Sequence, residues 1–206
     1  MKAMQNNSKE FKIIRRETPY QGFFRLEKYR LKHTLFAGGW TRELDRELFR
    51  RGNCVAVLLY DPKRDEIILI EQFRVGAILH QEQPWLLEIV AGAIEEGETA
   101  EQVAYRESRE EAGCEIQEIL KISEFYTTPG GSSERISLFC GRVDADNAEG
   151  IHGLDDEDED ILVRSVPFKE ACSLVEQGKI DSAIPILAIQ WLALNHSELR
   201  KKWLAE

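Results

Sequence analysis

Residues 92–114 read GAIEEGETAEQVAYRESREEAGC, and this stretch decides the fold of the chain around it. From residue 99 to residue 112 it contains no Gly or Pro, and its Ala, Glu, Gln and Arg residues favour a helix. Thr99 is a typical capping residue before a first turn, and Gly113 is typical of the position just after a helix ends. The stretch therefore predicts one helix between Thr99 and Gly113.

Three carboxylates gather on one face of this predicted helix. Glu107, Glu110 and Glu111 stand at positions i, i+3 and i+4, so their side chains are neighbours and repel one another unless a cation lies between them. Hard divalent ions such as Mg²⁺ take carboxylate oxygens and keep waters and substrate phosphates as their other ligands. Taken alone, an E-x-x-E-E face is usually a solvated acidic surface. The metal interpretation therefore depends on the residues around it.

Those residues complete a longer pattern, which resembles the signature box of the Nudix hydrolases. Its fixed points are Gly92, Glu98, Arg106, Glu107, Glu110, Glu111 and Gly113. Ser108 departs from the family pattern, which has Ala or an aliphatic residue there, and Cys114 fills a last aliphatic position as a small hydrophobe. The resemblance implies an α+β fold, an α/β/α sandwich with a mixed sheet, and hydrolysis of a nucleoside diphosphate linked to another group.

The same resemblance implies the metal site. Glu107 and Glu111 are the first expected ligands of Mg²⁺ (or Mn²⁺), with more than one ion per site. Glu110 shares or orients these ligands, and the backbone carbonyl of Ala91 is a further ligand. Supporting roles fall to Gly92, Glu98 and Arg106.

Composition excludes several other classes of protein. The 206 residues are 43% hydrophobic and 31% charged, which suits one globular domain with a small extra subdomain. A net charge of −10 argues against a nucleic acid or an anionic membrane as partner. Four dispersed cysteines without a C-x-x-C pair, and no apolar run at the start of the chain, predict a cytoplasmic protein without structural disulfides or a membrane span.

The chain outside the Nudix box divides into two predicted domains. Residues 1–51 hold three short runs separated by turns at residues 19–22 and 37–39, and these predict a small antiparallel meander. Residues 52–206 form the predicted catalytic domain. Its expected strands cover residues 54–60, 66–73, 85–90, 119–128, 135–143 and 159–168, and its other helices cover residues 168–178 and 184–204.

The meander is too small to be stable alone, so it packs either on the rest of the chain or on a second copy. Phe23, Phe24, Phe36 and Trp40 supply apolar surface for either arrangement, and the residues alone leave the choice open.

The broad layout resembles the ADP-ribose pyrophosphatase branch of the family. The meander, Arg74 after a buried strand, a late acidic loop and Pro129 about fifteen residues beyond the Nudix box carry this resemblance. Without it, residues 129–131 are simply a turn. The resemblance implies that ADP-ribose is cleaved to AMP and ribose 5-phosphate by a homodimer.

Matched by position, the resemblance also implies substrate contacts. Phe23, Arg46 and Arg74 are expected to hold the adenine, with Phe23 and Arg46 reaching the partner's site, and Glu134 is expected near the terminal ribose. For each residue alone, an exposed charge or core packing explains it equally well.

A general base is expected outside the Nudix box, because a carboxylate bound to metal has its lone pairs engaged and its pKa depressed. The acidic run at residues 155–160 follows Gly150 and Gly153 and suggests a mobile loop. By resemblance the base is Glu157, with Glu159 as second candidate; otherwise the run is a solvated loop. A calcium-binding EF-hand is a further interpretation of this run, but the run lacks the glycine and the ligand spacing of an EF-hand loop.

Two alternatives remain. A related enzyme with the same metal helix could cleave GDP-mannose or another nucleotide sugar. An inert module that senses ADP-ribose is a different class, and the intact glutamates of the Nudix box and the lack of an appended basic DNA-binding helix speak against it.

Overall fold

The computed structural model describes residues 9–80, 82–146 and 148–205, and these form two compact units. The N-terminal unit comprises the described chain up to Gly52 together with Tyr126–Glu134. The larger unit comprises Asn53–Phe125 and the chain from Arg135 onward. The predicted domain boundary after residue 51 stays a prediction, and residues 126–134, which it assigned to the catalytic domain, group here with the N-terminal unit.

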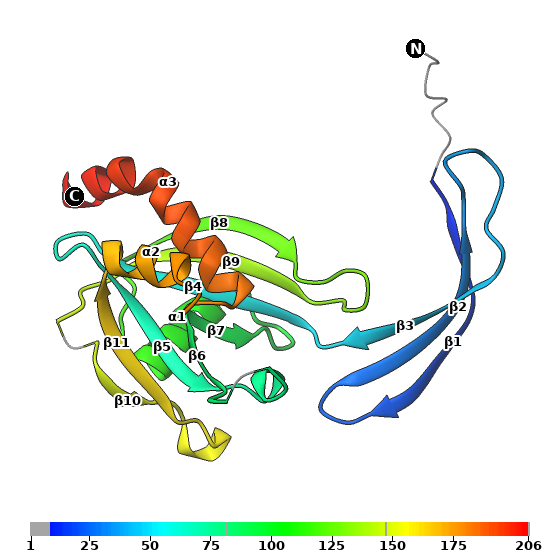
Figure 1. Ribbon diagram of the computed structural model, residues 1–206, viewed down its shortest axis with the longest axis horizontal. Coiled ribbons are helices and arrows are strands. Elements are labelled where there is room, and N and C mark those ends of the chain that lie inside the picture. The colour runs from blue at the N-terminus through cyan, green and yellow to red at the C-terminus, as the bar shows by residue number, and fades with distance from the viewer. Residues whose placement is uncertain (1–8, 81, 147, 206) are drawn as a thin grey trace, which may run out of the picture. The chain divides into compact units, whose positions relative to one another are not determined.

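The N-terminal unit contains the predicted meander. Strands β1 (Phe11–Gln21), β2 (Arg25–His33) and β3 (Leu44–Arg50) pair antiparallel in the order β1-β2-β3 (Figure 1). The first turn lies later than predicted, because Pro19 is still inside β1. A register shift between Glu17 and Tyr20 takes Pro19 out of the regular pairing, so its missing N–H is tolerated.

A buried carboxylate holds the meander together. Glu27 is 1% exposed, accepts a hydrogen bond from the Tyr29 hydroxyl at 2.5 Å, and is paired with Arg16 and Arg50. Burial alone would raise the pKa of Glu27, but the hydrogen bonds from Arg16 and Tyr29 lower it overall. Most side chains of β1 remain exposed, so the sheet is stabilised by polar contacts more than by an apolar core.

The larger unit is built on a mixed sheet of eight strands. In the described residues the sheet order is β10-β11-β5-β4-β9-β8, with β6 paired to β5 and β7 paired to β4. The β4–β9 pair is parallel, and the pairs of β5 with β4, β6 and β11 are antiparallel. The bounds are β4 (Asn53–Asp61), β5 (Glu66–Phe73), β6 (Trp85–Glu88), β7 (Val90–Ala93), β8 (Glu118–Tyr126), β9 (Arg135–Arg142), β10 (Gly150–His152) and β11 (Ile161–Pro167).

Helices cover both faces of this sheet, which confirms the predicted α/β/α sandwich. The continuous apolar run of β4 faces both ways: Val55 and Val57 pack with α1 (Ala100–Ala112), whereas Leu58 and Tyr60 pack with α2 (Phe168–Glu176) and α3 (Ala183–Ala205). Short 3₁₀ turns, η1 (Val75–Ala77) and η2 (Asp155–Glu157), interrupt two loops. None of the helices in the described chain is long and apolar enough to cross a membrane.

The single strand predicted for residues 85–90 is two strands in the structure. β4 pairs with β5 only at Leu59–Asp61, and elsewhere the two strands take different partners. β6 pairs with β5, and after Ile89 the chain crosses to pair with β4 as β7. This crossing brings Ala91 and Gly92 to the middle of the sheet, against α1, where the candidate site is formed.

Candidate active site

Helix α1 begins and ends where its sequence predicts. The Thr99 hydroxyl accepts from the backbone N–H of Gln102 at 3.2 Å, and the Gln102 side chain accepts from the N–H of Thr99 at 2.9 Å, which makes a full capping box. Gly113 has φ +62°, and a Cβ there would lie 2.7 Å from the ring of His152. The T-x-x-Q spacing signals this capping box in the sequence, although only Thr99 was predicted as a cap.

Two of the predicted metal ligands lie directly against the backbone of β7. A Cβ atom on Gly92 would come within 1.8 Å of Glu107 Oε1, so only glycine leaves room for this carboxylate. The N–H of Ala91 donates to Glu111 Oε2 at 2.9 Å. Glu111 is 3% exposed. The two carboxylates are therefore fixed beside the Ala91–Gly92 peptide, one helical turn apart.

The site holds more negative charge than it neutralises. Burial is the largest cause that raises the pKa of Glu107; with the charges of Glu110 and Glu159 acting in the same direction and Arg106 opposing them, this pKa reaches about 7. The pKa of Glu111 is raised to about 8, chiefly by burial and also by the charges of Glu107 and Glu159, against the lowering effect of the hydrogen bond from the N–H of Ala91. A cation placed between these carboxylates would be stabilised by their negative charges.

Arg106 fastens the loop before the helix to the acidic face. Its guanidinium contacts Glu98 at 3.2 Å, Glu107 at 2.8 Å and Glu110 at 2.9 Å, and Glu98 also accepts from the N–H of Glu95 at 3.0 Å. These contacts hold the loop against the helix, and the supporting roles of Glu98 and Arg106 in the reaction stay a prediction. The carboxylate of Glu110 is turned toward Arg106, and its role as a metal ligand stays a prediction.

The donor set suits a hard divalent cation. Glu107 and Glu111 offer carboxylate oxygens beside the Ala91–Gly92 backbone, and the lack of a side chain at Gly92 leaves room for Glu107; the carbonyl of Ala91 as a further ligand stays a prediction. Across the described ranges, no three Asp, Glu, His or Cys side chains are gathered closely enough to hold an ion by themselves. A backbone carbonyl, water and substrate oxygens would therefore complete the coordination, as is usual for Mg²⁺.

The acidic loop after β10 is tied to the end of α1. The N–H of Gly153 donates to the carbonyl of Glu110 at 3.2 Å, and the carbonyl of Leu154 accepts from Glu157 at 3.0 Å and from Glu159 at 3.2 Å. The side chain of Glu159 turns back to accept from the N–H of Leu154 at 3.2 Å, and its charge acts on Glu107. The side chain of Glu157 is exposed.

The predicted substrate residues fall into both units. Arg74 belongs to the larger unit, where its charge lowers the pKa of Glu111 and its Nε donates to Glu88 at 2.7 Å. Phe23 and Arg46 belong to the N-terminal unit. Phe23 is 95% exposed, and Arg46 donates to the carbonyl of Asp45.

Glu134 also belongs to the N-terminal unit and is already engaged there. Its side chain accepts from Arg51 at 2.7 Å and from the hydroxyl of Thr127 at 2.9 Å. These contacts brace the loop of residues 126–134, so the predicted role beside a ribose stays a prediction. Sequence reasoning passed over Glu88, for which the sequence carried no signal.

The two departures inside the Nudix box are accommodated by packing. Ser108 is fully buried, and its hydroxyl donates to the carbonyl of Ala104 at 2.7 Å, so a polar group replaces an aliphatic one without an unpaired donor. Cys114 is 3% exposed, and burial raises the pKa of its thiol to about 11, so it packs as the small hydrophobe that was predicted.

Comparison with known proteins agrees with this geometry. The family model of the NUDIX domain matches residues 50–188. The ADP-ribose pyrophosphatase of Escherichia coli K12 is 50% identical over 194 residues, 94% of this chain and 93% of that protein. The GDP-mannose pyrophosphatase of Shigella flexneri is 36% identical over 152 residues, 73% of this chain and 78% of that protein. A crystal structure described as an ADP compounds hydrolase shares the fold, with a TM-score of 0.71 at 20% identity over 97% of this chain and all of that one. Because the residues of the Nudix box, the α/β/α sandwich and these matches all agree, we conclude that the chain belongs to the NUDIX family.

Proposed function

We propose that this protein hydrolyses the pyrophosphate of ADP-ribose, giving AMP and ribose 5-phosphate, and that it requires a divalent cation, Mg²⁺ or Mn²⁺. The observation that carries the proposal is the pair Glu107 and Glu111, held against the Ala91–Gly92 backbone with strongly raised pKa values. The choice of ADP-ribose over GDP-mannose follows the higher identity to the E. coli ADP-ribose pyrophosphatase.

The chain's own residues supply binding, orientation and proton transfer. A divalent cation supplies positive charge that neutralises pyrophosphate oxygens and acidifies the attacking water. Glu107, Glu111 and the carbonyl of Ala91 would hold it, and more than one ion fits a substrate with two phosphates. Arg106 helps to keep Glu107 in place through its contact at 2.8 Å.

The acidic loop divides two tasks between two glutamates. Glu159 lies close enough to Glu107 and Glu111 for its charge to affect both, which suits it to assist in holding a cation. Glu157 is exposed on the same loop and is not engaged in that cluster, so it is the better placed proton acceptor. We therefore assign the general base to Glu157 and keep Glu159 as second candidate.

Recognition of the substrate is assigned to Arg74, Phe23, Arg46 and Glu134. The charge of Arg74 acts on Glu111, so we place its guanidinium at a phosphate oxygen, which it can pair with in bidentate geometry, and no longer at the adenine. The exposed ring of Phe23 suits stacking on adenine. The free thiols of the chain suit a reducing compartment, and we place the reaction in the cytoplasm.

Purified protein with Mg²⁺ is expected to convert ADP-ribose to AMP and ribose 5-phosphate, and EDTA is expected to abolish turnover. Product analysis by ion-exchange chromatography checks both points, with GDP-mannose measured in parallel. A higher kcat/KM for GDP-mannose would make the substrate assignment wrong. Tight binding of ADP-ribose without cleavage, at saturating Mg²⁺ and Mn²⁺, would favour an inert sensor instead.

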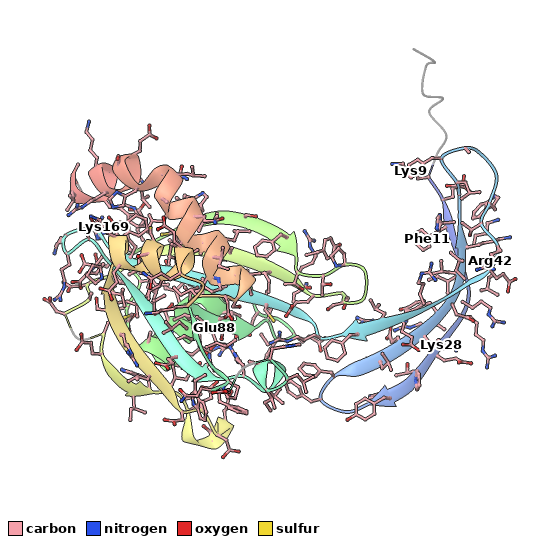
Figure 2. All side chains as sticks on the ribbon, viewed as in Figure 1. Lys9, Phe11, Lys28, Arg42, Glu88 and Lys169 are labelled. Carbon is pink, nitrogen blue, oxygen red and sulfur yellow. The ribbon has the colours of Figure 1, made fainter. Side chains whose placement is uncertain are left out.

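We further propose that the protein is a homodimer in which the N-terminal unit meets a second copy. The first 52 residues hold 13 Lys and Arg against 6 Asp and Glu, whereas the rest of the chain holds 14 against 31. The N-terminal unit exposes large apolar side chains such as Phe11 (labelled in Figure 2) and Tyr20, and the larger unit exposes Val75 and Leu79. Opposite charge and exposed apolar surface favour association between copies.

Light scattering at micromolar concentration is expected to give twice the mass of 23.7 kDa. Phe11→Glu is expected to weaken the dimer at least roughly tenfold, because it places a charge on an apolar contact surface. Leu194→Glu is the matched control, since Leu194 is 87% exposed on α3 and lies outside the proposed surface. A fully active monomer would refute both the dimer and the shared site.

A further inference from the structure

Gln72 is a buried polar residue that has no role in the reaction proposed above. It lies near the end of β5 and is 8% exposed, and among the described residues its Nε2 has no hydrogen-bond partner. A buried amide donor without a partner is costly, so native proteins rarely keep one without a reason. The position of Gln72 in the sheet indicates what that reason is.

Gln72 points to the face of the sheet that carries the active site. Side chains alternate along a strand, and Ile68 and Ile70 of β5 pack in the core beside α1. Arg74 continues the extended backbone with φ −127° and ψ 110°, and its N–H donates to the carbonyl of Pro84 at 2.8 Å. Ile70, Gln72 and Arg74 therefore follow one another on the same face.

An ion pair on the same face spans the position of Gln72. Glu88 of β6 is the cross-strand partner of Ile70, whereas Arg74 lies about 13 Å further along the strand by the ordinary rise per residue. Arg74 Nε nevertheless donates to Glu88 Oε2 at 2.7 Å. The line between the two side chains therefore passes the intervening cross-strand pair, Gln72 and Leu86. The pair thus lies on the face to which the buried amide of Gln72 belongs.

Glu88 is also within reach of the Gln72 amide. Leu86 is the direct cross-strand partner of Gln72, so Glu88 is its diagonal neighbour on the same face, a relation that long side chains span. The side chain of Glu88 is 15% exposed, whereas that of Arg74 is 38% exposed. Arg74 is thus the partner that can swing outward, and Glu88 is the one that stays in place.

We propose that Gln72 is a positioning residue that takes over Glu88 when Arg74 turns to the diphosphate of the substrate. Without substrate, Arg74 pairs with Glu88; with substrate, Arg74 pairs with a phosphate oxygen and the Gln72 amide donates to Glu88. The exchange spares the protein a buried carboxylate without a donor, which would otherwise oppose substrate binding. This inference rests on the proposed function, because it needs an anionic substrate at Arg74.

The test is a double-mutant cycle on Gln72→Met and Glu88→Gln, read by the KM and kcat of ADP-ribose hydrolysis. Met keeps the size of Gln without its donor. Gln72→Met is expected to raise KM roughly tenfold while kcat falls less than twofold, and to have less than a twofold effect in the Glu88→Gln background. Gln177→Met, an exposed change at the end of α2, is the control.

A second measurement follows the amide itself. The Gln72 side-chain NH₂ signal, assigned on wild-type protein, is expected to move downfield when the uncleavable α,β-methylene analogue of ADP-ribose is added with Mg²⁺. An unmoved signal, or an effect of Gln72→Met that persists in the Glu88→Gln background, overturns the exchange while leaving the proposed function intact. A wild-type protein that does not cleave ADP-ribose overturns the proposed function. In that case the double-mutant cycle is measured with the Kd of the analogue in place of KM. If the analogue does not bind, both the proposed function and the exchange at Gln72 are wrong.

Discussion

Replacing Glu111 with glutamine is expected to lower kcat for ADP-ribose by roughly 10² to 10⁴ while leaving the fold intact. Gln keeps the length and helix propensity of Glu, and its amide oxygen can still accept from the N–H of Ala91. What disappears is the negative charge at the most buried oxygen ligand of the proposed metal site. Steady-state rates at saturating Mg²⁺ and ADP-ribose measure the loss, and near-normal turnover there would contradict the ligand role.

The stability of the same variant without metal provides its control. The pKa of Glu111 is raised from its ordinary value of 4.5 to about 8 in the folded protein. The folded state therefore binds the carboxyl proton of Glu111 more tightly than the unfolded state does. The resulting stability is fully present below about pH 4.5 and is lost as the pH rises through about 8. In EDTA, the thermal unfolding temperature (Tm) of the wild-type protein should decrease as the pH rises from about 4.5 to about 8. The decrease in Tm should be smaller for Glu111→Gln. If Glu111→Gln were unfolded at pH 8, its loss of kcat could not be attributed to the metal site alone.

Replacing Glu157 with glutamine is expected to lower kcat at least roughly 10²-fold with KM little changed. The side chain is exposed and lies on a loop held to α1 by the hydrogen bond from Gly153 to Glu110. Removing its basicity should leave the binding of ADP-ribose and metal unaffected. The loss should therefore appear in the rate at saturation of both.

Glu159→Gln is the matched variant, two residues away on the same loop. Because Glu159 lies in the electrostatic field of Glu107 and Glu111, its loss should raise the Mg²⁺ concentration needed for half-maximal rate. A large drop in kcat for Glu159→Gln with little change for Glu157→Gln would show that the base is misassigned. If neither variant loses kcat, the loop only closes or screens the site.

The sequence alone determined the parts of this protein that depend on neighbouring residues. Helix α1 was predictable because Thr99, the run without Gly or Pro, and Gly113 act within one or two turns. The shared face of Glu107 and Glu111 follows from the helical repeat, and the continuous apolar run of β4 already indicates a strand buried on both faces. The spacing of the Nudix box also identified the family, which the comparisons confirm.

Tertiary structure decided the features that depend on pairing between distant segments. The split of residues 85–90 into β6 and β7 arises because β4 and β5 take different partners, and no local pattern encodes that choice. The grouping of residues 126–134 with the meander depends on backbone hydrogen bonds between Phe49 and the loop at Gly131. The unpartnered amide of Gln72, and the Arg74–Glu88 pair on the same face of the sheet, likewise depend on the pairing of β5 with β6. A sequence specifies which residues can donate, accept or repel, but register and strand order are set by the summed burial and hydrogen bonding of the whole sheet.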